Sequence, residues 1–487
     1  MPKAKSSPSP APPTSKPSPS PSPPTGKSSP SPGPPTGLPG GSQRSLSVGI
    51  ISLGCAKNLV DSQIMAGVML TENITIATTP EEADVLLVNT CSFIHDAREE
   101  SVAAILDACA LRDEGRPRAV VVTGCLPQRY RQELADSLPE VDAFVGLDGL
   151  ETIGAVIRNA AGGEHAAADI TPTSHRLYEP RLPSLSLTGG PFAYLKIGEG
   201  CNHPCAFCAI PSIRGRHRSR PIDALVAETE QLLASGIREI NLISQDTTSY
   251  GRDLEGADLP GVLGALGNIG GEFWIRILYG YPSEVTDAVL DAMGEVEQVL
   301  PYLDIPIQHS HPDILKAMRR AGTARAVKTL PARVRKRLPD ATLRTTCLVG
   351  FPGEKREHFS HLLDHVREAK YDHLGAFAFS PEEGTAAETL TGRPRPETAE
   401  RRRGKLLLAQ QEIVAERVAQ LVGSDDVALL ESPGDERGSW LARTRRQAPD
   451  VDGITFVSGL ANNAEAGDLV PVRYTGGADY DLFAELI

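Results

Sequence analysis

The sequence predicts an α/β protein with three folded parts: an N-terminal open parallel α/β sheet, a central partial (β/α) barrel and a small C-terminal β-barrel. Three observations predict this architecture. Apolar runs alternate with helical stretches over residues 45–160, and a longer alternation of the same kind fills residues 187–418. The last part, residues 420–487, holds short strand-like runs separated by glycine-rich turns. Alternating strands and helices form βαβ units, whereas short strands with such turns are typical of small barrels.

Residues 1–44 consist almost entirely of Pro, Ser, Gly, Thr and Lys, without an acidic or aromatic residue. Such a segment cannot bury enough apolar surface to offset the entropy lost on ordering, so we expect a disordered tail. A transit peptide is the alternative, but transit peptides are Arg-rich and amphipathic. A second stretch, from Ala160 to about Pro191, is rich in Gly, Ala, Ser and Pro and is expected to be a linker.

The first part contains three β-like runs, and helical stretches follow Asn58 and His95. Its predicted strands are 46–51, 85–89 and 119–122. The second part contains six βα units, which form an open or partial barrel when their crossovers are right-handed. Its predicted strands are 194–197, 239–243, 274–278, 302–305, 342–346 and 375–379. A charged helix from about Glu397 to Leu421 leads out of the barrel.

Composition narrows the possible environments and partners. The formal net charge is −13, with 62 acidic and 49 basic residues, which disfavours a tight non-specific grip on nucleic acid, although one local basic patch would suffice. No apolar run approaches the ~20 residues that span a bilayer, and the N-terminus lacks a signal-peptide pattern. We therefore expect a cytoplasmic protein without a membrane partner. In a reducing compartment, grouped cysteines indicate metal binding or catalysis before disulfides.

Three of the eight cysteines form the pattern Cys201-x-x-x-Cys205-x-x-Cys208, called here the loop set, directly after a predicted barrel strand. Three thiolates within eight residues can ligate three irons of a [4Fe–4S] cluster and leave the fourth iron open. A zinc site is the alternative, but it needs a fourth ligand close by. His203 lies within the loop, beside Pro204, and its spacing is poor. The pattern therefore favours an iron–sulfur cluster.

Three more cysteines, Cys55, Cys91 and Cys125, are called here the strand-end set, because each follows a predicted strand of the first part. The carboxyl ends of parallel strands meet at one edge of a sheet, where ligands bind. These cysteines could therefore hold a second cluster. A single buried cysteine is more often a small core residue, and we interpret Cys109 and Cys347 in that way.

The arrangement after residue 45 resembles the radical-SAM methylthiotransferases, which combine a three-cysteine N-terminal unit, a radical-SAM barrel and a C-terminal TRAM-like β-domain. Four stretches resemble in particular the RimO branch of this family. They are 208–215 (CAIPSIRG), 244–251 (SQDTTSYG), 303–309 (LDIPIQH) and 480–483 (YDLF). The tRNA-modifying branch generally differs at the first two.

The resemblance implies a transferase that replaces a β-hydrogen of an aspartate in small-subunit ribosomal protein S-twelve with a methylthio group. It implies two [4Fe–4S] clusters, a radical-SAM cluster on the loop set and an auxiliary cluster on the strand-end set. It also implies two molecules of S-adenosyl-L-methionine, one as methyl donor and one as radical source, and a low-potential reductant such as flavodoxin or ferredoxin. Methylthiolation of a tRNA adenosine near the anticodon is the alternative. Because both clusters must share a cavity, we expect the N-terminal sheet edge to cap the barrel mouth.

Weaker candidates exist for the S-adenosylmethionine pocket. Gln245 and Asp246 follow a predicted barrel strand, where such folds place active-site groups. The stretch from Gly350 to Glu354 follows another strand and resembles a nucleoside-contacting turn of the superfamily. Each could instead be turn chemistry or a helix cap. His309 and His311 are interpreted as polar residues that line the site. Asp246 and Glu354 are the titratable residues among the candidates for the S-adenosylmethionine pocket.

The C-terminal part bears on the choice of acceptor. From Ser424 onward it carries twelve acidic residues against five arginines, and Arg443, Arg445 and Arg446 form its single basic cluster. An acidic domain binds phosphate poorly, whereas ribosomal proteins are strongly basic. Charge and motifs together favour a protein acceptor over RNA.

Overall fold

The structure, a computed structural model, describes residues 45–113, 115–167, 170–177 and 184–487. The predicted tail, residues 1–44, lies outside the described residues. In the described ranges, no helix combines the length and the apolar character needed to cross a bilayer.

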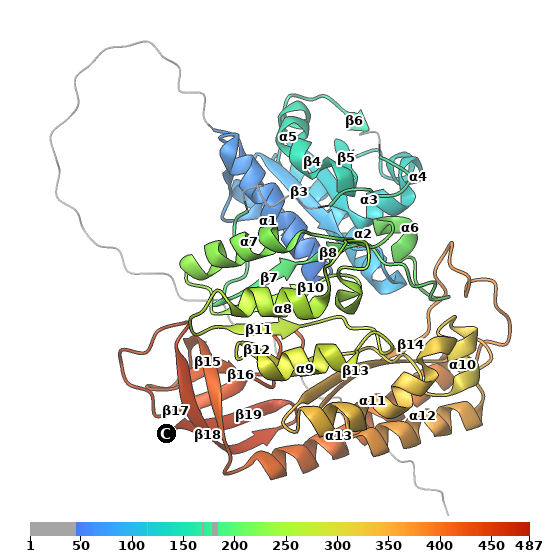
Figure 1. The fold of residues 1–487 in the computed structure, drawn as a ribbon. Coiled ribbons are helices and arrows are strands. Elements are labelled where there is room, and N and C mark those ends of the chain that lie inside the picture. Colours follow the sequence, from blue (N-terminus) through green and yellow to red (C-terminus); the bar gives the residue numbers. More distant parts are fainter. Residues whose placement is uncertain (1–44, 114, 168–169, 178–183) are drawn as a thin grey trace, which may run out of the picture. The chain divides into compact units, whose positions relative to one another are not determined.

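The N-terminal part is a six-stranded parallel sheet in the order β2-β1-β3-β4-β5-β6 (Figure 1). Its central strands β3 and β4 are buried along their whole length, as continuous apolar runs in parallel sheets require. The strands are β1 (Ser47–Ser52), β2 (Thr75–Ile76), β3 (Val85–Thr90), β4 (Ala119–Gly124), β5 (Ala143–Val145) and β6 (Ala166–Ala167). The helices are α1 (Ala56–Thr71), α2 (His95–Asp113), α3 (Cys125–Tyr130), α4 (Gln132–Ser137) and α5 (Ile153–Ala161). The short strands β2, β5 and β6 are missing from the sequence prediction because runs of two or three residues carry no periodic signal.

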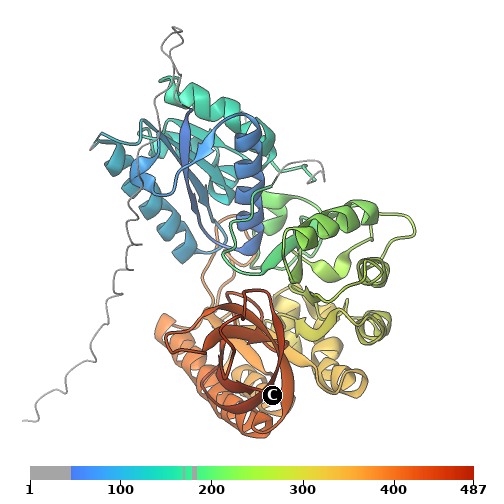
Figure 2. The ribbon, with the colours of Figure 1, turned by 90° about the vertical axis from the view of Figure 1, so that its left-hand side faces the viewer.

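The central part is a six-stranded parallel sheet in the order β14-β13-β12-β11-β10-β7, so that consecutive strands are neighbours, as in a partial barrel. Helices α7, α8, α9 and α11 lie along its outer face (Figures 1 and 2). The strands are β7 (Phe192–Lys196), β10 (Glu239–Ile243), β11 (Trp274–Ile277), β12 (Val299–Asp304), β13 (Thr342–Val349) and β14 (His373–Ala378). The helices are α6 (Ile210–Arg214), α7 (Ile222–Ala234), α8 (Leu259–Gly267), α9 (Asp287–Glu295), α10 (Pro312–Ala317), α11 (Ala324–Arg337) and α12 (Arg356–Ala369). A separate two-stranded pair, β8 (Gly198–Glu199) with β9 (Arg218–Ser219), brackets the loop set.

The C-terminal part follows the long helix α13 (Pro396–Leu421) and is a closed barrel of five strands in the order β15-β16-β17-β19-β18. The strands are β15 (Asp425–Pro433), β16 (Trp440–Thr444), β17 (Thr455–Ser458), β18 (Leu469–Ala478) and β19 (Asp481–Leu486). The predicted fold class of two parallel α/β sheets and a small β-barrel is confirmed.

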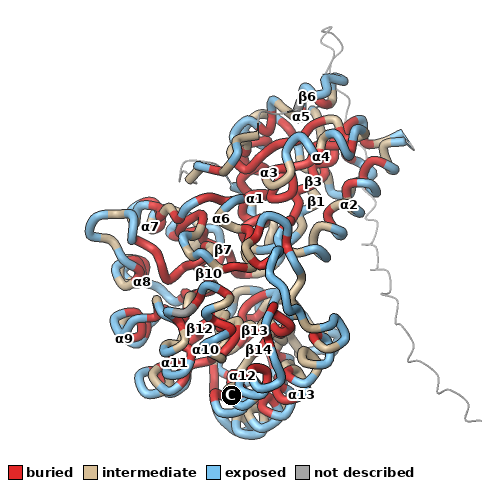
Figure 3. The backbone as a smooth tube through the Cα atoms, turned by 90° about the vertical axis from the view of Figure 1, so that its right-hand side faces the viewer, coloured by how far each residue is buried: buried red, intermediate tan, exposed pale blue. Residues whose placement is uncertain are grey.

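One hydrophobic cluster joins all three parts. It contains Ile64 and Met65 of α1, Tyr302 of β12, Leu429 of β15 and Ala448 of the C-terminal barrel, all of them nearly inaccessible to solvent. Figure 3 shows buried backbone running through both sheets, while the outer helices carry the exposed residues. Because a shared core resists separation of its parts, the N-terminal sheet is held against the inside of the partial barrel.

Candidate active site

The loop set lies between β8 and α6, on the segment that follows the first barrel strand. Gly200 adopts a φ of +79°, and a side chain there would collide with the carbonyl oxygen of Gly215, only 2.6 Å from an added Cβ. Two donors are directed at sulfur atoms: the backbone N–H of His203 at Cys201 (3.5 Å) and the guanidinium of Arg320 at Cys205 (3.3 Å). The loop is therefore folded tightly, and two of its three sulfur atoms accept a hydrogen bond.

Tyr281, which follows β11, supports this loop through its ring. The ring stacks on His203 with centroids 3.5 Å apart and an interplanar angle of 4°. The guanidinium of Arg320 lies 4.1 Å from the same ring centroid. A flat stack and a cation–π contact on one ring each stabilise by roughly 0.5–2 kcal/mol. Tyr281 thus positions the two residues that donate to Cys201 and Cys205.

The strand-end set converges around Asn58, in the first turn of α1. The Asn58 amide donates to the carbonyl oxygens of Leu53 (3.1 Å) and Thr90 (2.9 Å), which precede Cys55 and Cys91. Its Oδ1 lies 3.6 Å from the sulfur of Cys125. One amide therefore ties together the three strand ends on which these cysteines lie.

Two glycines allow this convergence. Gly54 has a φ of +91°, and a Cβ there would lie 2.7 Å from the Cβ of Cys91. Gly124 has a φ of +99°, and a Cβ there would lie 2.5 Å from the carbonyl oxygen of Thr90. Only glycine combines a positive φ with such a close approach of neighbouring chains.

Arg214 crosses from the barrel to the strand-end set. It lies at the end of α6, just after the loop set, and it is buried. Its guanidinium donates to the sulfur of Cys125 (3.5 Å) and to Oδ1 of Asn58 (2.7 Å), and it pairs with Asp61 (2.9 Å) and Glu199 (3.1 Å). The predicted contact between the N-terminal sheet edge and the barrel mouth is present here.

Carboxylates surround Arg214 in a compact ion network. Lys196 of β7 pairs with Asp61 (2.5 Å) and with Glu199 (3.0 Å), so that two cations share two anions. Burial alone would raise the pKa of Glu199, but Arg214 and Lys196 hold it well below the usual carboxyl range. Glu199 therefore holds both cations in place within the barrel, while Asp61 of α1 connects them to the N-terminal part.

Lys57 makes a second contact between the N-terminal part and the barrel. It lies two residues after Cys55, is 6 % exposed, and its ammonium group lies 2.7 Å from the ring centroid of Tyr279. Burial lowers the pKa of Lys57 to about 8. Tyr279 itself follows β11 and has a φ of +62°, an unusual conformation for a residue with a side chain. Because Tyr281 contacts the loop set, the segment Tyr279–Tyr281 touches the neighbourhoods of both cysteine sets.

The donor chemistry of both sets fits a cluster with thiolate ligands. All eight cysteines are free thiols. Burial raises the pKa of Cys201 to about 11 and those of Cys125 and Cys208 to about 12. Buried thiols of this kind stay protonated near neutral pH unless a metal displaces the proton. A cationic group directed at one sulfur of each set would stabilise the thiolate form once metal is bound.

The S-adenosylmethionine candidates after β10 have partners within the protein. The Gln245 amide donates to Glu199 (2.5 Å). Asp246 accepts from the His203 ring (2.6 Å) and from the backbone N–H of Thr248 (3.1 Å), which it caps. Burial would raise the pKa of Asp246, but hydrogen bonds from His203 and its own turn hold it low. Both residues lie beside the loop set, and their role in cofactor binding stays a prediction.

The candidates after β13 form a closed turn. Gly350 has a φ of +79°, and its backbone N–H donates to the Glu354 carboxylate. The other oxygen of Glu354 pairs with Arg402 of α13 (3.2 Å). Burial raises the pKa of Glu354. Glu354 therefore shapes this turn, and contact with a nucleoside stays a prediction.

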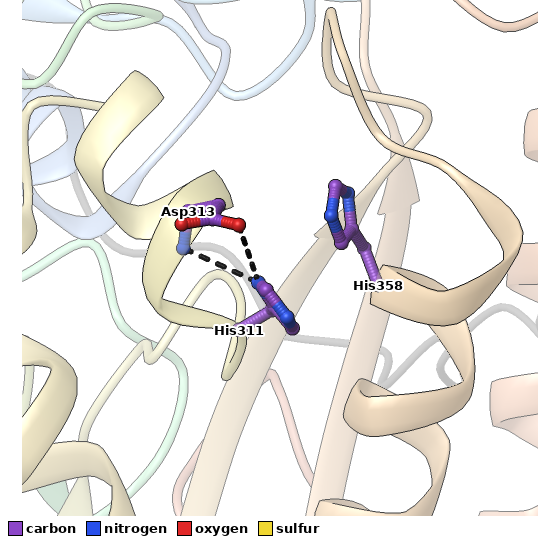
Figure 4. A group of neighbouring side chains, drawn as sticks. All are labelled: His311, Asp313 and His358. Carbon is purple, nitrogen blue, oxygen red and sulfur yellow. Dashed lines mark hydrogen bonds and ion pairs between the residues drawn. The ribbon is translucent and has the colours of Figure 1, made fainter.

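His309 and His311 lie in the segment between β12 and α10. His311, Asp313 and His358 gather so closely that one potential ligand atom from each lies within 4.8 Å of the others (Figure 4). However, Nδ1 of His311 accepts from the backbone N–H of Asp313 (3.2 Å), and Nδ1 of His358 accepts from that of Lys355 (3.1 Å). A neutral ring with an accepting Nδ1 carries its proton on Nε2, which cannot then bind a metal. These histidines cap α10 and α12.

The sequence interpretation missed the roles of Arg214, Lys57 and Tyr281. A signal existed for two of them, because Arg214 lies in the 208–215 motif and Lys57 follows Cys55 so closely. Nothing in the sequence indicates the stacking of Tyr281 on His203, since it depends on how the strand ends meet.

Three family models match the chain. "Uncharacterized protein family UPF0004" matches residues 47–146, "Radical SAM superfamily" matches residues 195–366, and "TRAM domain" matches residues 422–487. Among solved structures, the radical S-adenosylmethionine methyltransferase TsrM from Kitasatospora setae, with cobalamin and a [4Fe–4S] cluster bound, superposes with a TM-score of 0.54. The alignment covers 71% of this chain and 77% of that one at 14% sequence identity, a likeness of fold alone.

Curated relatives match over nearly their full length. The protein called "Ribosomal protein uS12 methylthiotransferase RimO" from Pelobacter propionicus is 41% identical over 447 residues, 91% of this chain and 99% of its own. The proteins of that name from Syntrophus aciditrophicus and Synechocystis are 44% and 43% identical, covering 91% and 90% of this chain and 99% and 97% of their own. With this identity and coverage, the chain belongs to the RimO family of radical-SAM methylthiotransferases.

Proposed function

We propose that this protein replaces a β-hydrogen of an aspartate in small-subunit ribosomal protein S-twelve with a methylthio group. The C–H bond breaks, its hydrogen leaves as part of 5′-deoxyadenosine, and a C–S bond forms. The methyl group comes from a second S-adenosylmethionine, which leaves as S-adenosylhomocysteine. An unactivated C–H bond needs a radical rather than a general base, which is chemistry that a cofactor supplies. The named activity of the curated relatives supports this proposal.

One observation carries the proposal furthest: the two cysteine sets lie on facing surfaces of the same domain boundary. Arg214, six residues after Cys208, donates to the sulfur of Cys125. Lys57, beside Cys55, stacks on Tyr279, two residues before the tyrosine that supports the loop set. A radical made at one set and sulfur held at the other would then act in one space.

Each set would hold one [4Fe–4S] cluster, the loop set for reductive cleavage of S-adenosylmethionine and the strand-end set for the transferred sulfur. The residues around them hold the two surfaces together and keep water out. Arg214 and Lys196 of the barrel pair with Asp61 of α1 across the boundary, and Glu199 pairs with the same two cations from the barrel side. The electrons would come from a low-potential reductant such as flavodoxin or ferredoxin in a reducing cytoplasm, where the six thiols stay available.

The basic cluster of the C-terminal barrel favours the protein acceptor over the tRNA adenosine. Arg443 is buried and pairs with Glu239 (2.5 Å) and Glu431 (2.7 Å). Arg445 and Arg446 both pair with Asp426 (2.5 and 3.5 Å). Because carboxylates of the protein already neutralise these arginines, they offer little to a phosphate backbone.

The acceptor is tested by mass spectrometry. Protein reconstituted with iron and sulfide is given dithionite, S-adenosylmethionine and either ribosomal protein S-twelve or bulk tRNA. We expect the ribosomal protein to gain one methylthio group at a single aspartate. Methylthiolation of tRNA alone would overturn the assignment.

The two-cluster arrangement is tested by two alanine variants. We expect Cys205→Ala to abolish deoxyadenosine formation, and Cys91→Ala to retain cleavage of S-adenosylmethionine without methylthiolation. Anaerobic iron analysis should give about eight irons per wild-type chain and about four in either variant. Full methylthiolation by both variants would contradict the assignment.

A further inference from the structure

Lys57 is a buried cation without a carboxylate partner. Within the described part of the chain, no carboxylate lies within ion-pair distance of its ammonium group, which lies over the face of the Tyr279 ring. The strongest electrostatic attraction on the ammonium group comes from Cys55, two residues away. A buried, unpaired charge is costly, and an aromatic face compensates only part of that cost. A site that retains such a charge therefore suits an anionic ligand.

The nearest carboxylates are already occupied. Asp304 pairs with Arg344 (3.1 Å) and accepts from the backbone N–H of Tyr279 (3.2 Å). Glu199 is held by Arg214 and Lys196. Neither is available to Lys57, although both lie close enough to influence it electrostatically.

The other buried cations near the two cysteine sets donate to acceptors of the protein, although Nε of Arg320 has no hydrogen-bond partner among the described residues. Lys196 and Arg214 share Asp61 and Glu199. Arg320 donates to the sulfur of Cys205 and to the carbonyl oxygen of Pro306 (2.9 Å). Among these buried cations of the described residues, Lys57 is the one whose charged group makes neither a hydrogen bond nor an ion pair.

We propose that the Lys57 ammonium group binds the side-chain carboxylate of the acceptor aspartate. This inference rests on the function proposed above, because that function makes the acceptor an aspartate. The β-carbon is bonded directly to the carboxylate carbon. Holding the carboxylate at Lys57 therefore places the reacting carbon beside Cys55 and next to the segment Tyr279–Tyr281, between the two cysteine sets.

A second source of a carboxylate exists in the methionyl group of S-adenosylmethionine. The position of Lys57 argues against this source. Lys57 lies two residues from Cys55 of the strand-end set, whereas the open iron expected to bind that methionyl group belongs to the loop set. The experiment below separates the two sources.

The test compares two forms of ribosomal protein S-twelve, one with the acceptor aspartate and one with asparagine in its place. Binding to reconstituted wild type, Lys57→Met, Lys57→Arg and the control Lys336→Met is measured by fluorescence anisotropy. Lys336 is exposed and lies on the outer helix α11. We expect wild type and the control to bind the aspartate form roughly tenfold to a hundredfold more tightly than the asparagine form. Lys57→Met should lose this preference, and Lys57→Arg should retain part of it.

Three further measurements separate the proposal from its rivals. Iron content, cluster electron paramagnetic resonance signals and substrate-free deoxyadenosine formation are compared with wild type for every variant, and they should be unchanged in the control Lys336→Met. If Lys57→Met kept the wild-type preference for the aspartate form, the inference would be overturned. This holds also if the variant weakened S-adenosylmethionine binding or shifted the cluster signals. A wild type without the preference would overturn it even if Lys57→Met failed to assemble. Failure of the proposed function looks different: wild type would neither bind nor modify either form.

Discussion

At the scale of single residues, each cysteine set has one buried cation directed at one of its sulfur atoms, Arg320 at Cys205 and Arg214 at Cys125. The spacing of Cys201, Cys205 and Cys208 is local, so the sequence alone indicates three ligands for one cluster. The donor that reaches Cys125 is Arg214, which lies in another part of the fold. For Asp246, the sequence indicates a function but not the contacts that its carboxylate makes. Its place after a barrel strand suggests cofactor binding, but its carboxylate caps its own turn and holds His203.

Arg214 provides the first prediction at this scale. Replacing Arg214 with Met would leave Asp61 and Glu199 buried with Lys196 as their single strong partner, and would remove the donor to Cys125. Breaking a buried ion pair on one side typically costs about 3–5 kcal/mol. We therefore expect Arg214→Met to lower the free energy of unfolding by about that amount, measured by chemical denaturation.

The control is Arg216→Met, two residues further along, where the side chain is exposed. A substitution at such a site usually changes stability by less than about 0.5 kcal/mol. In the holoenzyme, Arg214→Met should also shift the midpoint potential of one cluster, whereas Arg216→Met should shift neither. If the two variants lowered the free energy of unfolding equally, the contacts of Arg214 would not contribute to stability.

At the scale of elements, the junctions after β1 and β4 determine where the strand-end set lies. The sequence predicts β4, like its neighbour β3, because both are continuous apolar runs. It could not predict the backbone that follows, because Gly54 and Gly124 owe their positive φ to neighbouring strand ends. The short strand β5 was missed for a related reason, since pairing with β4 and β6, rather than periodicity, defines it.

Gly124 provides the prediction at this scale. Gly124→Ala would place a residue with a side chain at a φ of +99° and bring its Cβ to 2.5 Å from the carbonyl oxygen of Thr90. The strain alone costs about 1–2 kcal/mol, and the collision with backbone adds to it. We expect Cys125 to be displaced and the iron content to fall from about eight to about four per chain.

A glycine in a helix gives the matched control. Gly264 lies in α8, and an added Cβ there would meet no atom within 4 Å. Gly264→Ala should keep the full iron content and stabilise the protein by roughly 0.5–1 kcal/mol. If Gly124→Ala also kept all its iron, the close approach at Thr90 would have no bearing on cluster binding.

At the scale of the whole molecule, the three parts share one core as well as polar contacts. The hydroxyl of Tyr194 donates to Asp450 (2.8 Å), and that of Tyr302 donates to Asp452 (2.6 Å), which attaches the C-terminal barrel to the central sheet. The existence of the three parts could be predicted from alternation and composition. The contact of the N-terminal sheet edge with the barrel mouth could also be predicted, because two clusters would have to share a cavity. The packing of the C-terminal barrel on the central sheet could not, because residues such as Tyr302 look like ordinary strand residues in the sequence.

The charge of the C-terminal barrel gives the last prediction. Asp435 and Glu436 are exposed on the turn between β15 and β16 and make no ion pair within the described residues. If acidic groups here attract a basic ribosomal protein, the double variant Asp435→Lys, Glu436→Lys should slow association by roughly tenfold at low ionic strength. The same change of net charge at Glu255 and Glu272, exposed on the central part, should slow it less. In both double variants, the slowing of association relative to wild type should become smaller at high salt, where electrostatic attraction is screened. Equal slowing by the two double variants, followed by stopped-flow fluorescence, would assign the attraction to net charge instead of to this barrel.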